Sequence, residues 1–502
     1  MNNAKQLKIG AVLSYVSIAV NILAGLLYTP WMVHQIGDSA YGLYTLANSL
    51  IGLFLVDFGL SSATSRFVAK FRAQHKEDKI EELLTTIYGL YAALDVIIFV
   101  TLAVVYCFID VIYQNLTPAE IVQFKVVYCI AGTYSLINFP CMTFNGILNA
   151  YEKFIPLKLA DVIYRISVVL VTVIAISLDG GLYALVIANA FCGLLSIGFK
   201  YIFVAKSVKI KIRLKNLNKE YLKDIFKFSI WTTVCALAQR LIFNITPTIL
   251  GIVDVNASSS IAVFGIVVTI EGYVYLITTA INGMFLSKIS RLLIADNRRE
   301  ELTKLMTLVG RFQYAVNGIV VVGFALVGRE FILLWMGESF VDAYMGIVLV
   351  LLPGLFYNSL QIAQTAFIAQ NLVKYQAYIQ LVVGIINVVL SLVLSGLFGV
   401  IGAAVSICIA YFIRTVLTLF LAHRKLDVDL KYYIIHCYLK MSVPIIATLA
   451  VSVPIILLFE GVSWLNLVIK GLIIASVFLL ATFVAGITKS ERQKLLNIIK
   501  RN

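Results

Sequence analysis

The stretch VDFGLSSATSRFVAKF, residues 56–71, closes a long apolar run that begins near Tyr41. It places the carboxylate of Asp57 among apolar side chains and then leads into a basic cluster that starts at Arg66. An ionisable group inside a membrane span costs free energy against lipid, so it usually faces a partner or a hydrated cavity. The stretch therefore indicates a membrane helix that carries a carboxylate of possible functional use and ends on a basic surface.

The composition places the chain among membrane proteins. Of its 502 residues, 61% are hydrophobic and only 13% are charged, whereas soluble domains carry about 25% charged residues. A helix that crosses a hydrocarbon layer of about 30 Å needs about 20 apolar residues. Such runs recur at 9–31, 41–65, 84–110, 121–144, 157–178, 181–205, 229–252, 260–286, 307–328, 343–368, 376–396, 398–421, 434–458 and 464–486. The sequence thus predicts an all-α polytopic membrane protein with about 14 transmembrane helices.

The basic residues predict the orientation of the chain, because lysine and arginine are enriched in cytoplasmic connections. Of the 40 basic residues, 35 lie at the termini or in the even-numbered connections. Of the other five, only Arg329 lies in a connection on the opposite side. We therefore expect both termini to be cytoplasmic. The net charge of +14 reflects this arrangement, and we expect no nucleic-acid partner because the basic residues belong to no polar recognition domain.

Internal repetition divides the chain into two similar parts, as is common in transporters. Thr29-Pro30 matches Thr246-Pro247, and Gly181 matches Gly402. The repeats contain six helices each, an even number, so both enter the membrane from the same side. They are therefore parallel rather than inverted.

The repeat predicts the domain organisation. We expect two pseudo-symmetric six-helix bundles, at residues 1–205 and 229–422, joined by a basic cytoplasmic linker at residues 206–228. The end of this linker is either a solvated connection that follows the positive-inside rule or an amphipathic helix on an anionic membrane surface. Residues 423–502 then form a C-terminal helix pair and a cytoplasmic tail.

Several kinds of chemistry find no support in the sequence. No GxxxxGK[ST] phosphate loop occurs, so transport energy would come from an ion gradient, the membrane potential or the substrate gradient. The histidines and cysteines lack metal-binding spacings, so we expect no metal, no cofactor and no catalytic residues. Asp427-x-Asp429 is weak support for a sugar-nucleotide site. The connections opposite the basic side are short, which disfavours a membrane glycan polymerase or ligase.

Ionisable residues inside the spans are the candidate functional groups: Asp57, Asp95, Asp161, Arg165, Arg240 and Glu271. Arg240 and Glu271 lie near the membrane midplane and either pair with each other or line a hydrated path. Asp161 and Arg165 are four residues apart, so they either form a salt bridge along one helix face or leave the arginine for substrate.

The polar side of the second predicted helix also has two interpretations. Asp57 is followed by Ser61 and Ser62 one turn later. These side chains form either a strip that faces water or a helix–helix interface built from small residues.

Two stretches carry a resemblance to a known family. IGDSAYGLYTLANSLIGLFLVDFGLSSATSRFVAKF (36–71) and NGILNAYEKFIPLKLADVIYRI (145–166) resemble the bacterial polysaccharide flippases, which export O-antigen and capsule repeat units. These belong to the multidrug/oligosaccharidyl-lipid/polysaccharide exporter superfamily, together with the multidrug and toxin extrusion exporters and the lipid II flippases. The resemblance implies two six-helix bundles that alternate in access around a cationic cavity.

The resemblance also implies a substrate and partners. The substrate would be an undecaprenyl-pyrophosphate-linked oligosaccharide, flipped from the inner to the outer leaflet of the bacterial cytoplasmic membrane. A polysaccharide polymerase and other glycan-assembly proteins would be partners, besides membrane lipid. The chain would not be an enzyme.

Individual residues can then be given roles. Guanidinium groups suit phosphate because they offer a planar fork of donors. The candidates for pyrophosphate binding are Arg165 and Arg240, with Arg66 and Lys288 at corresponding helix ends. The candidates for coupling to H⁺ or Na⁺ are Glu271, Asp57, Asp95 and Asp161. A cation-coupled multidrug exporter and a lipid II flippase remain alternatives.

Overall fold

The described residues of the computed structural model form helices joined by short connections, with no strand among them. These residues are 3–207, 219–280, 285–293, 297–457, 459, 461–487 and 492. The predicted all-α class is confirmed. Residues 208–218 of the predicted basic linker and most of the C-terminal tail lie outside the described residues, while the end of the linker is helical from Lys219 onward and continuous with the following span.

The chain forms two compact units, residues 1–265 and 266–502. The first unit contains α1 (Asn3–Ile36), α2 (Asp38–Phe54), α3 (Leu60–Ala73), α4 (Glu77–Ile112), α5 (Pro118–Cys141), α6 (Thr143–Ala150), α7 (Phe154–Ser177), α8 (Gly181–Ser207), α9 (Lys219–Phe243) and α10 (Ile245–Val253). The second contains α12 (Leu286–Leu292), α13 (Arg298–Met336), α14 (Ala343–Tyr357), α15 (Gln361–Ala369), α16 (Val373–Leu426), α17 (Leu430–Tyr433), α18 (Lys440–Ile456) and α19 (Trp464–Ala481). Helix α11 (Ala257–Thr279) has residues in both units. Short helical turns at Glu338–Phe340, Asn358–Leu360, Ile434–Leu439 and Thr482–Gly486 complete the second unit.

Twelve helical segments of the described chain are long and apolar enough to cross a membrane. One of them, α16, has 54 residues, which is about 81 Å of helix and more than twice a hydrocarbon layer of about 30 Å. Gly399 interrupts it with a non-helical backbone conformation. Counting α16 as two spans and α2 with α3 as one broken span gives the predicted 14.

The second predicted span, 41–65, is not one helix, which corrects the prediction. Helix α2 ends at Phe54 and α3 begins at Leu60. Between them, Phe58 and Gly59 have φ angles of 50° and 68°. This is the left-handed region, which glycine adopts freely and a bulky aromatic residue seldom does. The break places Asp57 outside both helices.

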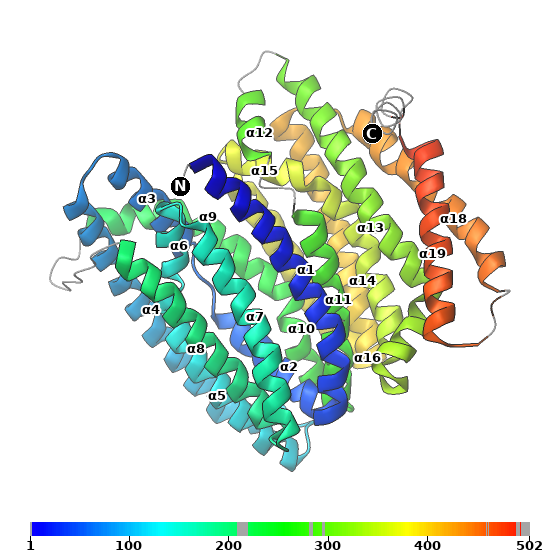
Figure 1. Cartoon of the computed structure of the whole chain (residues 1–502), viewed down its shortest axis with the longest axis horizontal. Helices are drawn as coiled ribbons and strands as arrows, with labels where there is room; N and C mark the ends of the chain where they lie inside the picture. Colours follow the sequence, from blue (N-terminus) through cyan, green and yellow to red (C-terminus); the bar gives the residue numbers. More distant parts are fainter. Residues whose placement is uncertain are drawn as a thin grey trace. The chain divides into compact units, whose positions relative to one another are not determined.

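Close helix contacts hold the first unit together. Helix α3 packs against α6, α7 against both α1 and α8, and α2 against α5 (Figure 1). At the α3–α6 contact, a Cβ atom added to Gly146 would lie 2.4 Å from the carbonyl oxygen of Ser61. Ala63 and Thr64 are fully buried. The structure thus gives this side of α3 the small-residue interface that was one of its two interpretations.

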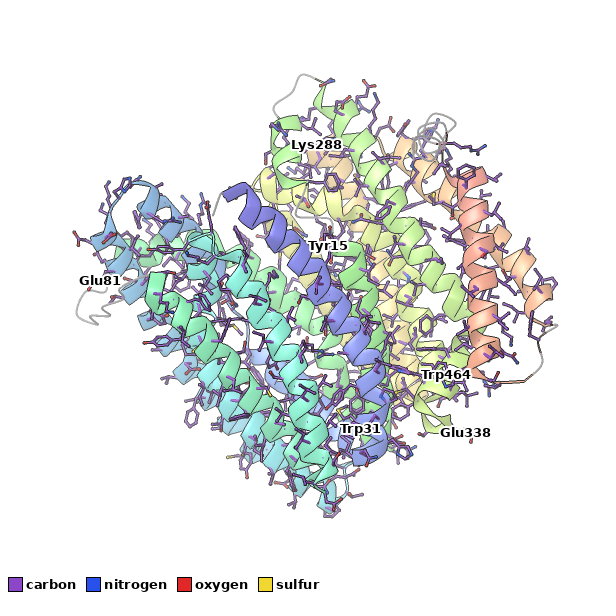
Figure 2. The ribbon with its side chains drawn as sticks, viewed as in Figure 1. Tyr15, Trp31, Glu81, Lys288, Glu338 and Trp464 are labelled. Atoms are coloured by element: carbon purple, nitrogen blue, oxygen red, sulfur yellow. The ribbon has the colours of Figure 1, made fainter. Side chains whose placement is uncertain are left out.

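The second unit is built around α13, which contacts α14, α18 and α19. Helix α14 packs on α16. Apolar side chains of α13, α18 and α19 form one buried cluster that includes Val322, Ile456 and Ile474. In this unit Lys288 lies at one end, and Glu338 and Trp464 lie at the other (Figure 2). In the first unit, Glu81 and Trp31 likewise mark opposite ends. Tryptophan is enriched where a membrane meets water.

Two features recur in the two units at about the spacing of the predicted repeat. Helices α4 and α13 begin at Glu77 and Arg298, a separation of 221 residues (298 − 77). The α7–α8 turn contains Gly181 with a φ of 55°, and Gly399 within α16 has a φ of 54°. Gly399, rather than the predicted Gly402, is therefore the conformational counterpart of Gly181. Positive φ at both positions requires glycine or a strained residue.

Candidate functional site

The carboxylate of Asp57 is fixed at the α2–α3 break. Its Oδ1 atom accepts a hydrogen bond of 2.6 Å from the hydroxyl of Tyr91, in α4. Its Oδ2 atom accepts from the backbone N–H of Ser61 at 3.1 Å. The second bond satisfies one of the N–H groups that the first turn of a helix leaves without a helical partner. Asp57 therefore stabilises the start of α3 and carries a charge where the helix is interrupted.

Asp95 extends this polar region along α4. It lies four residues beyond Tyr91, so the two side chains share a helix face. The Oδ1 atom of Asp95 is buried and has no hydrogen-bond partner. A buried carboxylate oxygen without a partner is costly, so such a group needs an explanation beyond packing.

Arg165 and Asp161 do not form the salt bridge that was one of their two interpretations. Asp161 instead pairs with Lys200 at 3.3 Å and Lys158 at 3.8 Å. Arg165 donates from Nη2 to the carbonyl of Asn21, in α1, at 3.4 Å, and its buried Nε has no hydrogen-bond partner. Helix α8 brings Lys200 to Asp161, so the acid is neutralised by lysines and the arginine keeps its charge.

Arg240 has a similar environment at the end of α9. Its Nη1 atom donates to the amide oxygen of Asn244 at 3.3 Å. Gly52 of α2 faces both side chains, since a Cβ atom at this position would lie 2.8 Å from the Asn244 amide and 3.5 Å from Arg240 Nη1. Neither Arg165 nor Arg240 pairs with a described carboxylate of its own unit. The suggested Arg240–Glu271 pair joins the two units and stays a prediction.

The remaining predicted cations lie at helix surfaces. Arg66 is exposed on α3, and Lys288 is exposed on α12. Neither side chain is buried within its unit.

In the second unit, Glu271 belongs to a cluster that the sequence did not predict. Arg414 of α16 is only 4% exposed. Its guanidinium carbon lies 4.1 Å from the ring centroid of Tyr357 and 5.3 Å from that of Tyr411. The positive charge of Arg414 acts on the carboxylate of Glu271, in α11. Cation–π contacts and a nearby carboxylate can hold a guanidinium in an apolar interior.

The 35 basic residues predicted to lie at the termini or in cytoplasmic connections include Arg414, which the structure instead places inside α16. The signal that locates it is its position inside the apolar run 398–421, well before the basic end of α16.

Asp427 and Asp429 also have structural roles. Asp427 caps α16 and lies 3.9 Å from Arg299, while Asp429 caps α17. The described residues contain no cluster of histidine, cysteine and acidic side chains that would hold a metal.

Comparison with known proteins identifies the family. The family described as "Polysaccharide biosynthesis protein" matches residues 7–285, more than half of the chain. The chain belongs to this family. The uncharacterized membrane protein EpsK of Bacillus subtilis (strain 168) is 21% identical over 503 residues, which cover 94% of each protein.

Solved structures with a similar fold are transporters and flippases. The lipid II flippase MurJ in an inward closed conformation superimposes with a TM-score of 0.73 and 15% identity, over 95% of this chain and 98% of MurJ. An inward-facing multidrug resistance MATE family transporter of the MOP superfamily gives 0.63 and 14% identity, over 85% and 98% of the two chains. The predicted resemblance is thus confirmed for family and fold. The chain is a multi-pass membrane protein of the polysaccharide biosynthesis family with the fold of these transporters.

Proposed function

We propose that the chain flips undecaprenyl-pyrophosphate-linked oligosaccharide repeat units from the inner to the outer leaflet of a bacterial cytoplasmic membrane by alternating access. The family match supports a role in polysaccharide biosynthesis. The observation that carries the proposal is the pair of half-buried arginines, Arg165 and Arg240, which are held by neutral oxygen atoms.

Charge explains why such arginines are useful. A pyrophosphate and its sugars cannot enter hydrocarbon without losing their hydration, whereas a polyprenyl tail can remain there. A flippase therefore offers the head group an environment with fixed positive charge. Arg165 and Arg240 supply planar donors for phosphate oxygens, and Arg66 and Lys288 supply positive charge at helix surfaces.

Coupling to an ion gradient is the second part of the proposal. Asp57, Asp95 and Glu271 are the carboxylates that could take up H⁺ or Na⁺. Asp95 is the strongest candidate of the first unit because one of its oxygens is buried without a partner. Asp161 is the weakest because two lysines already neutralise it.

The test uses the purified chain in proteoliposomes with a fluorescent polyprenyl-pyrophosphate oligosaccharide. Flipping exposes the labelled head group to a quencher that cannot cross the membrane. We expect Arg165→Ala/Arg240→Ala to reduce the rate at least tenfold, because each lost charge-assisted contact to phosphate is worth about 1.5–3 kcal/mol. Arg165→Lys/Arg240→Lys should retain part of the activity. Arg329→Ala, an exposed change in α13, is the control.

Normal flipping by the correctly inserted Arg165→Ala/Arg240→Ala protein would contradict the residue assignment.

Lipid II is a second candidate substrate, because the lipid II flippase MurJ aligns with this fold over 98% of the MurJ chain. Labelled lipid II in the same assay distinguishes the two substrates. Movement of a cationic drug with neither lipid would favour a multidrug exporter, and sugar transfer between lipids would favour a polymerase or ligase.

A further inference from the structure

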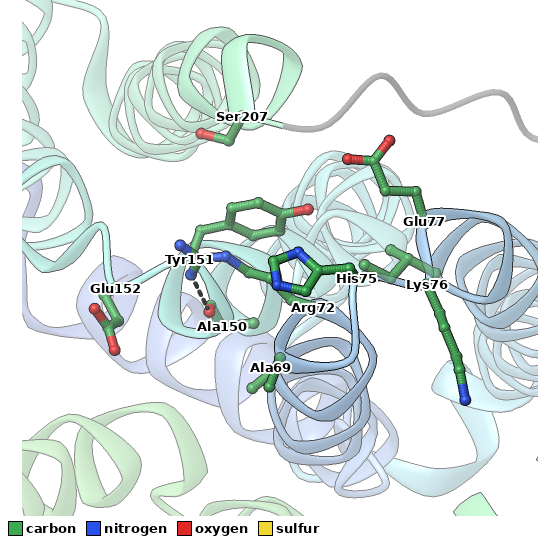
Figure 3. A pocket seen from close by; sticks show the side chains of 11 residues that line it. Ala69, Arg72, His75, Lys76, Glu77, Ala150, Tyr151, Glu152 and Ser207 are labelled. Atoms are coloured by element: carbon green, nitrogen blue, oxygen red, sulfur yellow. Dashed lines mark hydrogen bonds between the residues drawn. The ribbon is translucent and has the colours of Figure 1, made fainter.

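A pocket of about 650 Å³ opens in the first unit. It lies where α3 ends and α4 begins, next to the end of α6 and the last residue of α8 (Figure 3). This end of the helices carries the connections that are predicted to be cytoplasmic. Three basic side chains, Arg72, His75 and Lys76, line the pocket, with the ring of Tyr151.

Arg72 is held in place by uncharged groups. Its Nη1 atom donates to the carbonyl of Ala150 at 3.0 Å, and its guanidinium carbon lies 4.8 Å from the ring centroid of Tyr151. These contacts orient the guanidinium without neutralising it. Its other N–H groups are available to a ligand, which a planar fork of donors suits well when the ligand is a phosphate.

Carboxylates line the pocket but do not pair with its cations. No ion pair among the described residues joins Arg72, His75 or Lys76 to an acid. Figure 3 shows the carboxylates of Glu77 and Glu152 at opposite ends of the view, with Arg72 and His75 between them under the Tyr151 ring. The guanidinium of Arg72 therefore supplies a fixed positive charge at the centre of the pocket, with the imidazole of His75 beside it.

The backbone brings His75 to this centre. His75 has a φ of 53°, in the left-handed region. The turn is fixed by hydrogen bonds from its own N–H to the carbonyl of Arg72 and from the N–H of Lys76 to the carbonyl of Phe71, both at 3.0 Å. A left-handed residue with these hydrogen bonds is a common way for a helix to end, and here it places the imidazole of His75 beside Arg72 (Figure 3).

The second repeat provides a comparison at the corresponding place. The turn before α13 borders a pocket of about 410 Å³ that also contains basic side chains. There, Lys304 pairs with Glu300, and Arg299 lies 3.9 Å from Asp427. The cations of this second pocket are thus neutralised within the chain. The pocket at Arg72 differs because its cations have no such partners.

We propose that the pocket at Arg72 and His75 binds a phosphoryl group, separately from the groups assigned to flipping. Its size exceeds that of a single phosphate and suits a larger head group. Two sources can present this chemistry at a membrane surface. One is the head group of an anionic phospholipid, and the other is a soluble phosphate or pyrophosphate compound.

The experiment measures binding to the purified full chain in nanodiscs. One arm titrates inorganic pyrophosphate into nanodiscs of zwitterionic phosphatidylcholine and follows binding by calorimetry. The other arm uses native mass spectrometry to count phosphatidylglycerol molecules retained from mixed vesicles. The variants are Arg72→Gln, which removes the central charge, and His75→Asn, which removes the imidazole but tolerates the left-handed backbone.

A further variant keeps every charge and fills the space, namely Ala69→Phe at the pocket wall. Arg72→Gln loses the hydrogen bond to the carbonyl of Ala150. If that variant does not fold, Ala69→Phe still tests whether the pocket binds the ligand. The matched control is Lys70→Gln, which removes an exposed charge from the same helix outside the pocket lining. We expect affinity to fall about tenfold or more in the three pocket variants, as for loss of one charge-assisted hydrogen bond, and less than threefold in Lys70→Gln.

Each outcome decides the proposal. Retention of phosphatidylglycerol alone that depends on the pocket identifies a lipid head group, and pyrophosphate binding alone identifies a soluble ligand. Binding that the pocket variants leave unchanged overturns the proposal. So does an equal loss in Lys70→Gln, because the basic surface would then bind anions without a defined site.

Discussion

The buried pair between Lys470 and Glu330 should be essential for attaching α19 to α13. Lys470 is 2% exposed, and its Nζ atom donates to both carboxylate oxygens of Glu330, at 2.7 and 3.0 Å. Removing one member of a buried pair leaves the other charge uncompensated and costs about 3–5 kcal/mol in proteins. The Glu330 side chain is 24% exposed, so partial hydration should place Lys470→Met near about 3 kcal/mol.

Replacing both charges should restore most of the stability, because neutral side chains in the same volume leave no buried charge. The measurement is thermal unfolding of the purified protein in detergent, for Lys470→Met, Glu330→Gln and the double variant. Glu338→Gln, an exposed change just beyond α13, is the control. A double variant as unstable as Lys470→Met alone would refute the reasoning, since the loss would then come from packing. So would a Lys470→Met protein as stable as the wild type.

Three further predictions concern single contacts. Gly146→Ala should destabilise the protein by about 1–3 kcal/mol, because the added methyl overlaps a backbone carbonyl of α3. The control is Gly198→Ala, whose added methyl meets no atom within 4 Å and should leave the stability unchanged. Thermal unfolding of both variants measures the difference. Tyr91→Phe should cost about 1–3 kcal/mol by removing a hydrogen bond to Asp57, and unchanged unfolding would show that water replaces the hydroxyl. Arg414→Gln should reduce flipping in proteoliposomes more than Arg414→Lys, because lysine keeps the positive charge although it loses the planar stacking on tyrosine; equal rates in the two variants would show that the positive charge of Arg414 does not contribute.

The sequence predicted the membrane class and the approximate number of spans because both depend on length and hydropathy. It missed the α2–α3 break for the same reason. The residues around the break, such as Leu55, Val56 and Phe58, are as apolar as a continuous helix requires. Gly59 is the residue of this stretch that readily adopts a left-handed conformation. Because glycine is also common inside membrane helices, its presence does not by itself predict a break.

The candidate site was predictable in part. Charged residues inside apolar runs are rare, so Asp57, Arg165 and Arg240 could be found from position alone. Their partners could not, because these come from other helices. Asp161 illustrates the difficulty, since spacing along α7 favoured Arg165 whereas the neighbouring helix α8 supplies Lys200.

The interrupted segment also affects how membrane topology can be mapped. Helix α2 has 17 residues and α3 has 14, so they extend about 26 Å and 21 Å, and neither alone crosses a hydrocarbon layer of about 30 Å. A reporter enzyme fused after Phe54 would follow a hydrophobic segment that is too short to cross the membrane. Fusions placed at Phe54 and at Gln74 should therefore disagree about that segment, and only full-length labelling of single cysteines would report its true sidedness.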